Sequence, residues 1–173
     1  MSTQGQANLD RQGIECIIKQ KQALADAAYK ELYMLAERMP LKNLCVIRLN
    51  NGDDVLLGIT EAVKKLNIKN AIIIAGTGST INHHFHLVAS ANFPPGDIFV
   101  KADKPSDILN VNGLIINGRP HVHITHVVKD LAYGGHLEEG VKVLTFMSIT
   151  LAEVDFDLDQ WDGLGRIEDL RKK

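Results

Sequence analysis

The sequence predicts an α+β fold: a single compact domain with a mixed, mostly antiparallel sheet or barrel, one or two helices, and an extra N-terminal helix. Two observations support this prediction. Hydrophobic residues recur with helical spacing in two segments of the first half, and the second half consists of short β-rich segments separated by turns. The length of 173 residues, of which 45% are hydrophobic and 23% charged, suits one domain with additions at its ends.

The first 42 residues are predicted to form an N-terminal helical extension. Residues 9–39 contain a single glycine and are expected to be helical. One hydrophobic stripe recurs at intervals of four, four, three and four residues: Leu24, Ala28, Leu32, Leu35 and Met39. Pro40 then ends the helix. We expect this stripe to pack on the domain or on a neighbouring subunit rather than to bind a ligand.

Residues 43–154 are predicted to form the main domain, and residues 155–173 a C-terminal tail. The alternating segment "CVIRL" indicates a strand, "NNGDD" supplies turn and helix-capping residues, and Val55–Leu66 has helical spacing. The uncharged, β-branched run "AIIIAG" is typical of a buried strand. The remaining segments are predicted to be mostly antiparallel strands: "TINHHFHLVAS", "DILNVNGLIING", "PHVHITHVV" and "GVKVLTFMSITLAEVDF".

The composition excludes several classes of protein. A net charge of −2 argues against a general electrostatic attraction to DNA or to anionic membranes. Cys16 and Cys45 lie far apart, so a disulfide framework or a thiolate zinc site is not expected. The first residues lack a signal-peptide pattern, and "NAIIIAG" is too short to cross a bilayer. We therefore expect a soluble, cytoplasmic protein without a membrane partner.

All seven histidines lie between His83 and His136. Residues two apart in a strand share a face, with side chains about 7 Å apart, so His121 and His123 project together. His126 is an odd number of positions from His123, which sends it to the opposite face. The double glycine in "YGGHL" permits a closely packed return, and an antiparallel return brings His136 beside the pair.

Three imidazoles with an open fourth position are the ligand set of a catalytic zinc site. We therefore predict that His121, His123 and His136 bind a divalent metal, with zinc foremost and nickel, iron, copper and manganese as alternatives. The alternative interpretation is an exposed strand with a polar face. His84 and His86 form a second same-face pair, which we interpret as a surface or subunit-interface strand, with a ligand role less favoured.

From these residues the sequence resembles the plants-and-prokaryotes-conserved (PPC) domain in its stand-alone prokaryotic form. The similarity runs from "RLNNGDDVLLGITEAVKKLNIKNAIIIAGTGSTIN" through "PSDILNVNGLI" to "GRPHVHITHVV", "GGHLEEGVKVLT" and "AEV". It implies an α+β homotrimer with metal-binding histidines at His121, His123 and His136, and a fold similar to that of acetolactate decarboxylase. That enzyme holds zinc with a comparable His-x-His and a later histidine; because the later spacing differs here, its chemistry is not transferred.

Glu139 and Glu153 match acidic positions of the family and are the candidates for proton transfer at the metal; a solvated turn acid is the alternative for Glu139. Arg48 is weighed as a clamp for an anionic substrate and assigned instead to a surface ion pair. The predicted function is a metal-binding homotrimer that acts on or senses a small molecule. One alternative is a DNA-binding regulator of the same family that uses the lysines of "EAVKKLNIKN" and "KADK", although "NGRP" has only one arginine of an AT-hook. The other is a structural trimer whose histidines only satisfy hydrogen bonds.

Overall fold

The computed structural model describes residues 19, 36–92 and 95–158. The chain divides after Arg38 into two units, and the second unit, Met39–Lys173, contains every element named below. The predicted N-terminal helix lies outside the described residues, apart from Lys19, which is helical, and residues 36–39, which have no regular secondary structure. Most of the predicted C-terminal tail, residues 159–173, lies outside them as well.

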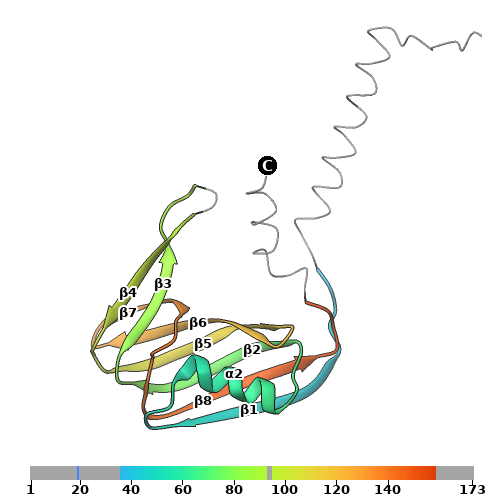
Figure 1. Ribbon diagram of the computed structural model, residues 1–173, viewed down its shortest axis with the longest axis horizontal. Helices are drawn as coiled ribbons and strands as arrows, with labels where there is room; N and C mark the ends of the chain where they lie inside the picture. Colours follow the sequence, from blue (N-terminus) through green and yellow to red (C-terminus); the bar gives the residue numbers. More distant parts are fainter. Residues whose placement is uncertain (1–18, 20–35, 93–94, 159–173) are drawn as a thin grey trace, which may run out of the picture. The chain divides into compact units, whose positions relative to one another are not determined.

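The described part of the domain is one sheet with one helix (Figure 1). The elements are β1 (Leu41–Asn50), α2 (Val55–Lys65), β2 (Ala71–Thr80), β3 (His83–Val88), β4 (Asp97–Ala102), β5 (Ser106–Ile116), β6 (Arg119–Val128), β7 (Leu131–Leu137) and β8 (Val143–Val154). The strands follow the order β1-β8-β2-β5-β6-β7-β3-β4, and every described pairing is antiparallel. The expected mixture with parallel strands is therefore wrong for the described residues, because the connections are mostly too short for parallel crossovers.

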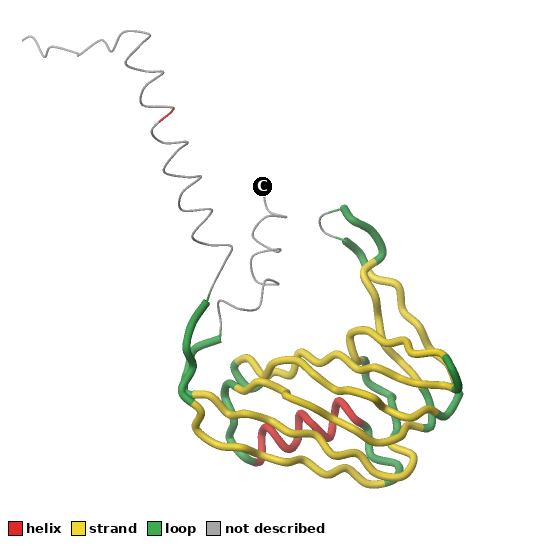
Figure 2. The backbone as a smooth tube through the Cα atoms, turned by 180° about the vertical axis from the view of Figure 1, so that it is seen from behind, coloured by secondary structure: helices red, strands yellow, loops and turns green. Residues whose placement is uncertain are grey.

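Helix α2 forms where the sequence places its spacing and its cap. Asp54 is the N-cap residue, and its side chain accepts a hydrogen bond of 3.1 Å from the backbone N–H of Leu57. Val55, Ile59 and Val63 recur at intervals of four and are buried. The helix packs with this face on the inner face of the sheet, and Figure 2 shows it lying along the strands. We call this the inner face and the opposite side the outer face.

The alternation along β6 separates the two faces. Val122, Ile124 and His126 are buried on the inner face, whereas His121 and His123 point to the outer face. On the outer face the cross-strand register continues from His121 through Leu114, Ile72 and Ala152 to Leu44.

The hairpin of β3 and β4 extends away from the rest of the sheet (Figure 1). Strand β3 pairs with β7 at two positions only, Phe85 opposite Leu137 and His86 opposite His136. Strand β4 is the last strand in the sheet order. The base of this hairpin therefore adjoins the strands that carry the other histidines.

Candidate metal centre

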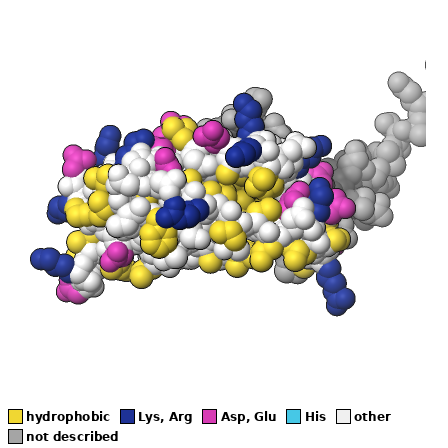
Figure 3. Space-filling view, turned by 90° about the horizontal axis from the view of Figure 1, so that it is seen from below, with side chains coloured by type: hydrophobic (Ala, Val, Ile, Leu, Met, Phe, Trp, Pro, Cys, Tyr) yellow, Lys and Arg dark blue, Asp and Glu magenta, His cyan; other side chains and the backbone are white. Residues whose placement is uncertain are grey.

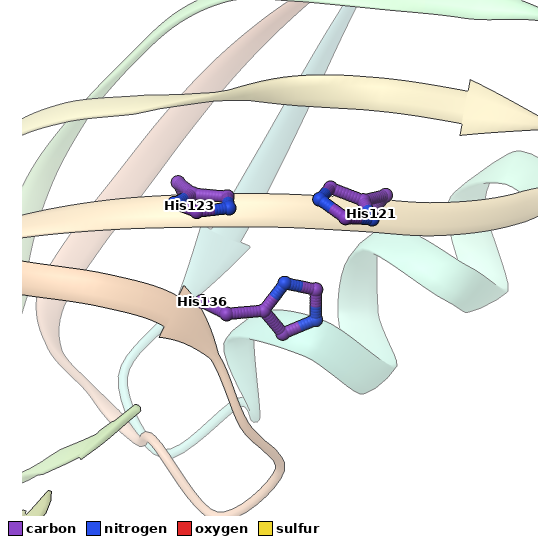
Figure 4. Close-up of side chains that lie close together, drawn as sticks. All are labelled: His121, His123 and His136. Carbon is purple, nitrogen blue, oxygen red and sulfur yellow. The ribbon is translucent and has the colours of Figure 1, made fainter. Parts of the chain in front are cut away.

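Three histidines converge on the outer face of the sheet. His121 and His123 lie side by side along β6, and His136 reaches toward them from β7 (Figure 4). The ring centroids are 5.5 Å apart for His121 and His123, 4.6 Å for His121 and His136, and 5.4 Å for His123 and His136. The structure thus brings together the three residues predicted from the sequence.

The double glycine sets the separation of β7 from its neighbours. A Cβ atom on Gly134 would lie 1.9 Å from the carbonyl oxygen of Ile124 on β6, and one on Gly135 would lie 2.4 Å from the carbonyl oxygen of His86 on β3. Neither position tolerates a side chain without a shift of the backbone. This close approach puts His136 in register with His123 on one side and with His86 on the other.

Burial keeps two of the three rings uncharged. It lowers the pKa of His136 to about 4, with a further contribution from the neighbouring His121 and His86. Burial also lowers the pKa of His123, and the adjacent His121 adds to this effect. These rings are therefore neutral near pH 7, which is the state in which an imidazole nitrogen can bind a metal.

The donor set fits a divalent cation. Each residue offers a ring nitrogen within 4.8 Å of a nitrogen of the other two. Two nitrogens bound to one zinc ion at about 2.0–2.1 Å lie no more than about 4.2 Å apart, so small rotations of these rings complete the coordination. His123 is exposed and the other two are half-buried, which leaves room for a further ligand from solvent.

A fourth histidine, His86, lies beside the three. Its ring stacks on that of His136 with centroids 4.5 Å apart, and its Nδ1 donates a hydrogen bond of 2.6 Å to Glu138. Its Nε2 lies 3.8 Å from a carboxylate oxygen of Asp97. From the sequence, a ligand role for His86 is less favoured than a surface or interface role, because nothing in the sequence shows that β3 pairs with β7. The His84–His86 spacing is the one signal for it.

The acids chosen from the sequence do not meet the three histidines. The backbone carbonyl of Glu139 accepts a hydrogen bond from His84 Nδ1, and it is the neighbouring Glu138 whose carboxylate contacts a histidine. Glu153 is in register with Ala71, on the inner face, and β8 is separated from β6 by β2 and β5. Three strand spacings amount to about 14 Å, so Glu153 does not reach the metal ligands of its own chain.

Glu153 and Arg48 have other contacts. Asn43 donates a hydrogen bond of 2.6 Å to Glu153, and Lys42 lies 3.1 Å away. The Asn43 hydrogen bond lowers the pKa of this carboxyl, with Lys42 adding to the effect against burial. The guanidinium of Arg48 donates to the side chain of Asn50 and lies 5.7 Å from the centre of the Phe146 ring, and the ion pairs found among the described residues do not include Arg48.

Two further histidines form a separate group on the inner face. His83 and His126 are fully buried, with ring centroids 4.4 Å apart. Ser106 contacts Nδ1 of His126 at 2.9 Å, and the hydroxyl of Tyr133 contacts Nδ1 of His83 at the same distance. Both Nε2 atoms are buried without a hydrogen-bond partner. We call His83 and His126 the inner pair; the odd spacing from His123 predicts the face on which His126 lies.

A pocket of about 720 Å³ lies against the three outer histidines. Its lining includes His121, His123, His136 and His86, together with residues next to the loop of the β3–β4 hairpin. None of the described helices is long and apolar enough to span a membrane.

One family model matches the chain: the Plants and Prokaryotes Conserved (PCC) domain, over residues 37–155. No curated protein matches the chain. Among solved structures, a protein from Archaeoglobus fulgidus described as metal-containing is similar with a TM-score of 0.62 and 19% identity, over 72% of this chain and 88% of that chain. A plant- and prokaryote-conserved (PPC) protein from Pyrococcus horikoshii has a TM-score of 0.61 and 21% identity, over 72% and 87%.

A third similar structure comes from Bacteroides thetaiotaomicron and is described as a candidate DNA-binding protein. Its TM-score is 0.58 at 17% identity, over 70% of this chain and 87% of that chain. At these identities the similarity concerns the fold.

Proposed function

The chain belongs to the Plants and Prokaryotes Conserved domain family, and from this premise we propose that it binds one divalent metal ion, zinc foremost, through His121, His123 and His136. The observation that carries the proposal is the convergence of three ring nitrogens within 4.8 Å of one another. The similarity to a metal-containing protein of the same fold supports it. We propose further that the ion serves to bind, and then to sense or convert, a small molecule.

A divalent ion held by three imidazoles supplies a Lewis acid with an open coordination position. The protein's own residues prepare the site in two ways. Burial keeps His123 and His136 neutral, and Glu138 holds the ring of His86 in place beside them. The sequence-based roles of Glu139 and Glu153 in proton transfer remain proposals; for Glu153 the role requires a site completed by another subunit.

Metal content of protein purified without a His-tag tests the metal proposal. We expect about one equivalent of a divalent ion by elemental analysis, and a rise in melting temperature when zinc is added to chelator-treated protein. A protein without metal that also shows no thermal response to zinc would contradict the proposal.

We also propose that the protein is a homotrimer located in the cytoplasm. In support of self-association, β1, β2 and β8 expose hydrophobic side chains, among them Leu44 and Val46 (both 64%), Ile74 (53%) and Phe146 (43%). Figure 3 shows hydrophobic side chains among scattered charges on one side of the molecule. Light scattering coupled to size-exclusion chromatography measures the mass, and a monomer at micromolar concentration would contradict the proposal.

A DNA-associated regulator is the second candidate function. Two similar structures are described as candidate DNA-binding proteins, and this observation alone favours it. It predicts binding to duplex DNA that weakens steeply as salt increases. Absence of retention on immobilised duplex at low ionic strength would remove this candidate.

A further inference from the structure

The pocket beside the three histidines has one apolar wall. Leu87, Val88 and Pro95 come from the β3–β4 hairpin, and Ala132 comes from β7. Val88 is 70% exposed and lies on the same strand face as His86, so it presents hydrophobic surface to the pocket. A ligand with a hydrocarbon body would bury this surface.

The charged groups of the pocket also restrict which ligands it can bind. The described residues that line the pocket include no lysine or arginine, and their one carboxylate is that of Asp97. A second carboxylate, that of Glu138, accepts a hydrogen bond from His86, which lines the pocket. A divalent ion at the three histidines would be the single positive centre of this pocket, with two carboxylates nearby to offset it.

From this combination we propose that the metal pocket takes small monocarboxylates with an aliphatic body, and discriminates against phosphorylated ligands. The carboxylate would occupy the open position of the ion, and the hydrocarbon would lie against Val88, Pro95 and Ala132. A phosphate dianion has the same access to the ion, but it meets Asp97 with no cation to balance its second charge. This inference rests on the proposed metal site and adds to it the chemical class of its ligand.

The test uses the full chain loaded with cobalt(II), whose visible spectrum changes when a ligand enters its coordination sphere. Butanoate, hexanoate and hexyl phosphate are titrated at one pH and one ionic strength. Each buried methylene adds about fourfold in affinity, so hexanoate, with two more methylenes, is expected to bind about fifteenfold more tightly than butanoate. Hexyl phosphate, whose hydrocarbon chain is one methylene longer, is nevertheless expected to bind at least about tenfold more weakly than hexanoate.

Matched variants separate the pocket from general effects on the protein. Val88→Asp is expected to weaken hexanoate binding about tenfold, because it places a charge in the hydrocarbon wall. Leu57→Asp changes another exposed hydrophobic residue, 48% exposed on α2 and on the inner face away from the pocket, and is expected to leave affinity unchanged. Asp97→Asn is expected to narrow the difference between hexanoate and hexyl phosphate, whereas Asp107→Asn on β5 is not.

The outcomes distinguish the two proposals. If cobalt does not bind before any carboxylate is added, the metal site itself is refuted. If cobalt binds but hexyl phosphate competes as well as hexanoate, or chain length has no effect, the ligand class is overturned and the metal site stands. Loss of hexanoate affinity in Leu57→Asp as large as in Val88→Asp also overturns the assignment to this pocket.

Discussion

Strands β3, β6 and β7 present polar rings on both sides of the sheet, and the two groups differ in what surrounds their nitrogens. On the outer face, His121, His123 and His136 converge and adjoin an open pocket. On the inner face, His83 and His126 are fully buried, and each ring has one nitrogen bonded to a hydroxyl and one without a partner. The same residue type is therefore placed for ligand binding on one side and for packing on the other.

The contrast shows that burial alone does not identify a functional histidine. Burial lowers the pKa of His126 and of His136 to about 4 in each case, although only the second has two further rings within reach of one ion. What separates the two faces is the number of converging nitrogens and the presence of space beside them. Four experiments test this distinction between the two faces.

The largest effect is expected for metal affinity in His123→Ala. Removing one of three protein ligands should weaken zinc binding at least about a hundredfold, with little loss of stability in the metal-free protein, because His123 is exposed. Elemental analysis and the zinc-induced shift in melting temperature measure the effect. His84→Ala, on the same face but outside the converging set, is the control and should retain the metal.

The second effect is on stability, in His126→Ala. This change removes a fully buried ring and leaves a cavity next to Phe85 and His83, which should cost about 3 kcal/mol in the free energy of unfolding. Urea denaturation of chelator-treated protein measures it. Equal metal content in this variant and the wild type would support the distinction between the faces, whereas loss of metal would argue against it.

The third effect is the contribution of His126 to the pH dependence of stability. Because the pKa of His126 is about 4 in the folded chain and about 6.5 when unfolded, the unfolded state binds more protons between these values. Stability from this group is complete above pH 6.5 and is lost as pH falls toward 4, by up to about 3 kcal/mol. Unfolding free energies of His126→Gln across this window should fall less steeply than those of the wild type. Parallel slopes would contradict the assignment.

The smallest effect is expected for Tyr133→Phe. The change removes the hydroxyl that contacts Nδ1 of His83 at 2.9 Å and leaves that buried nitrogen without its partner, which should cost about 1 to 2 kcal/mol. Denaturation midpoints in urea resolve a difference of this size. A stability equal to that of the wild type would mean that the hydroxyl does not stabilise the inner pair.

Local patterns predicted much of the fold and the three converging histidines. Strand periodicity assigned the faces of His121, His123 and His126, and the acid before Val55 marked the start of the helix. Each of these depends on residues close together in the sequence. The antiparallel return that brings up His136 required one longer step, which the double glycine made visible.

The pairing of strands that are far apart in the chain could not be predicted from the sequence. His86 joins the site because β3, some 50 residues before β7 in the chain, pairs with it through two residues. The choice between Glu138 and Glu139 depends on the course of the chain after β7, and the position of Glu153 depends on a sheet order that places β2 and β5 between β8 and β6. Non-local register of this kind leaves no periodic trace in a single sequence.

The absence of side chains at Gly134 and Gly135 determines how closely β7 approaches its neighbours, and therefore the geometry of the whole site. An added methyl group at either position would push β7 away from a neighbouring carbonyl group. The ring of His136 would then move together with β7. The arrangement of the three histidines thus depends on two glycines that are not metal ligands themselves. A chain that carried all three histidines but alanines at these two places would keep the donors and lose their alignment.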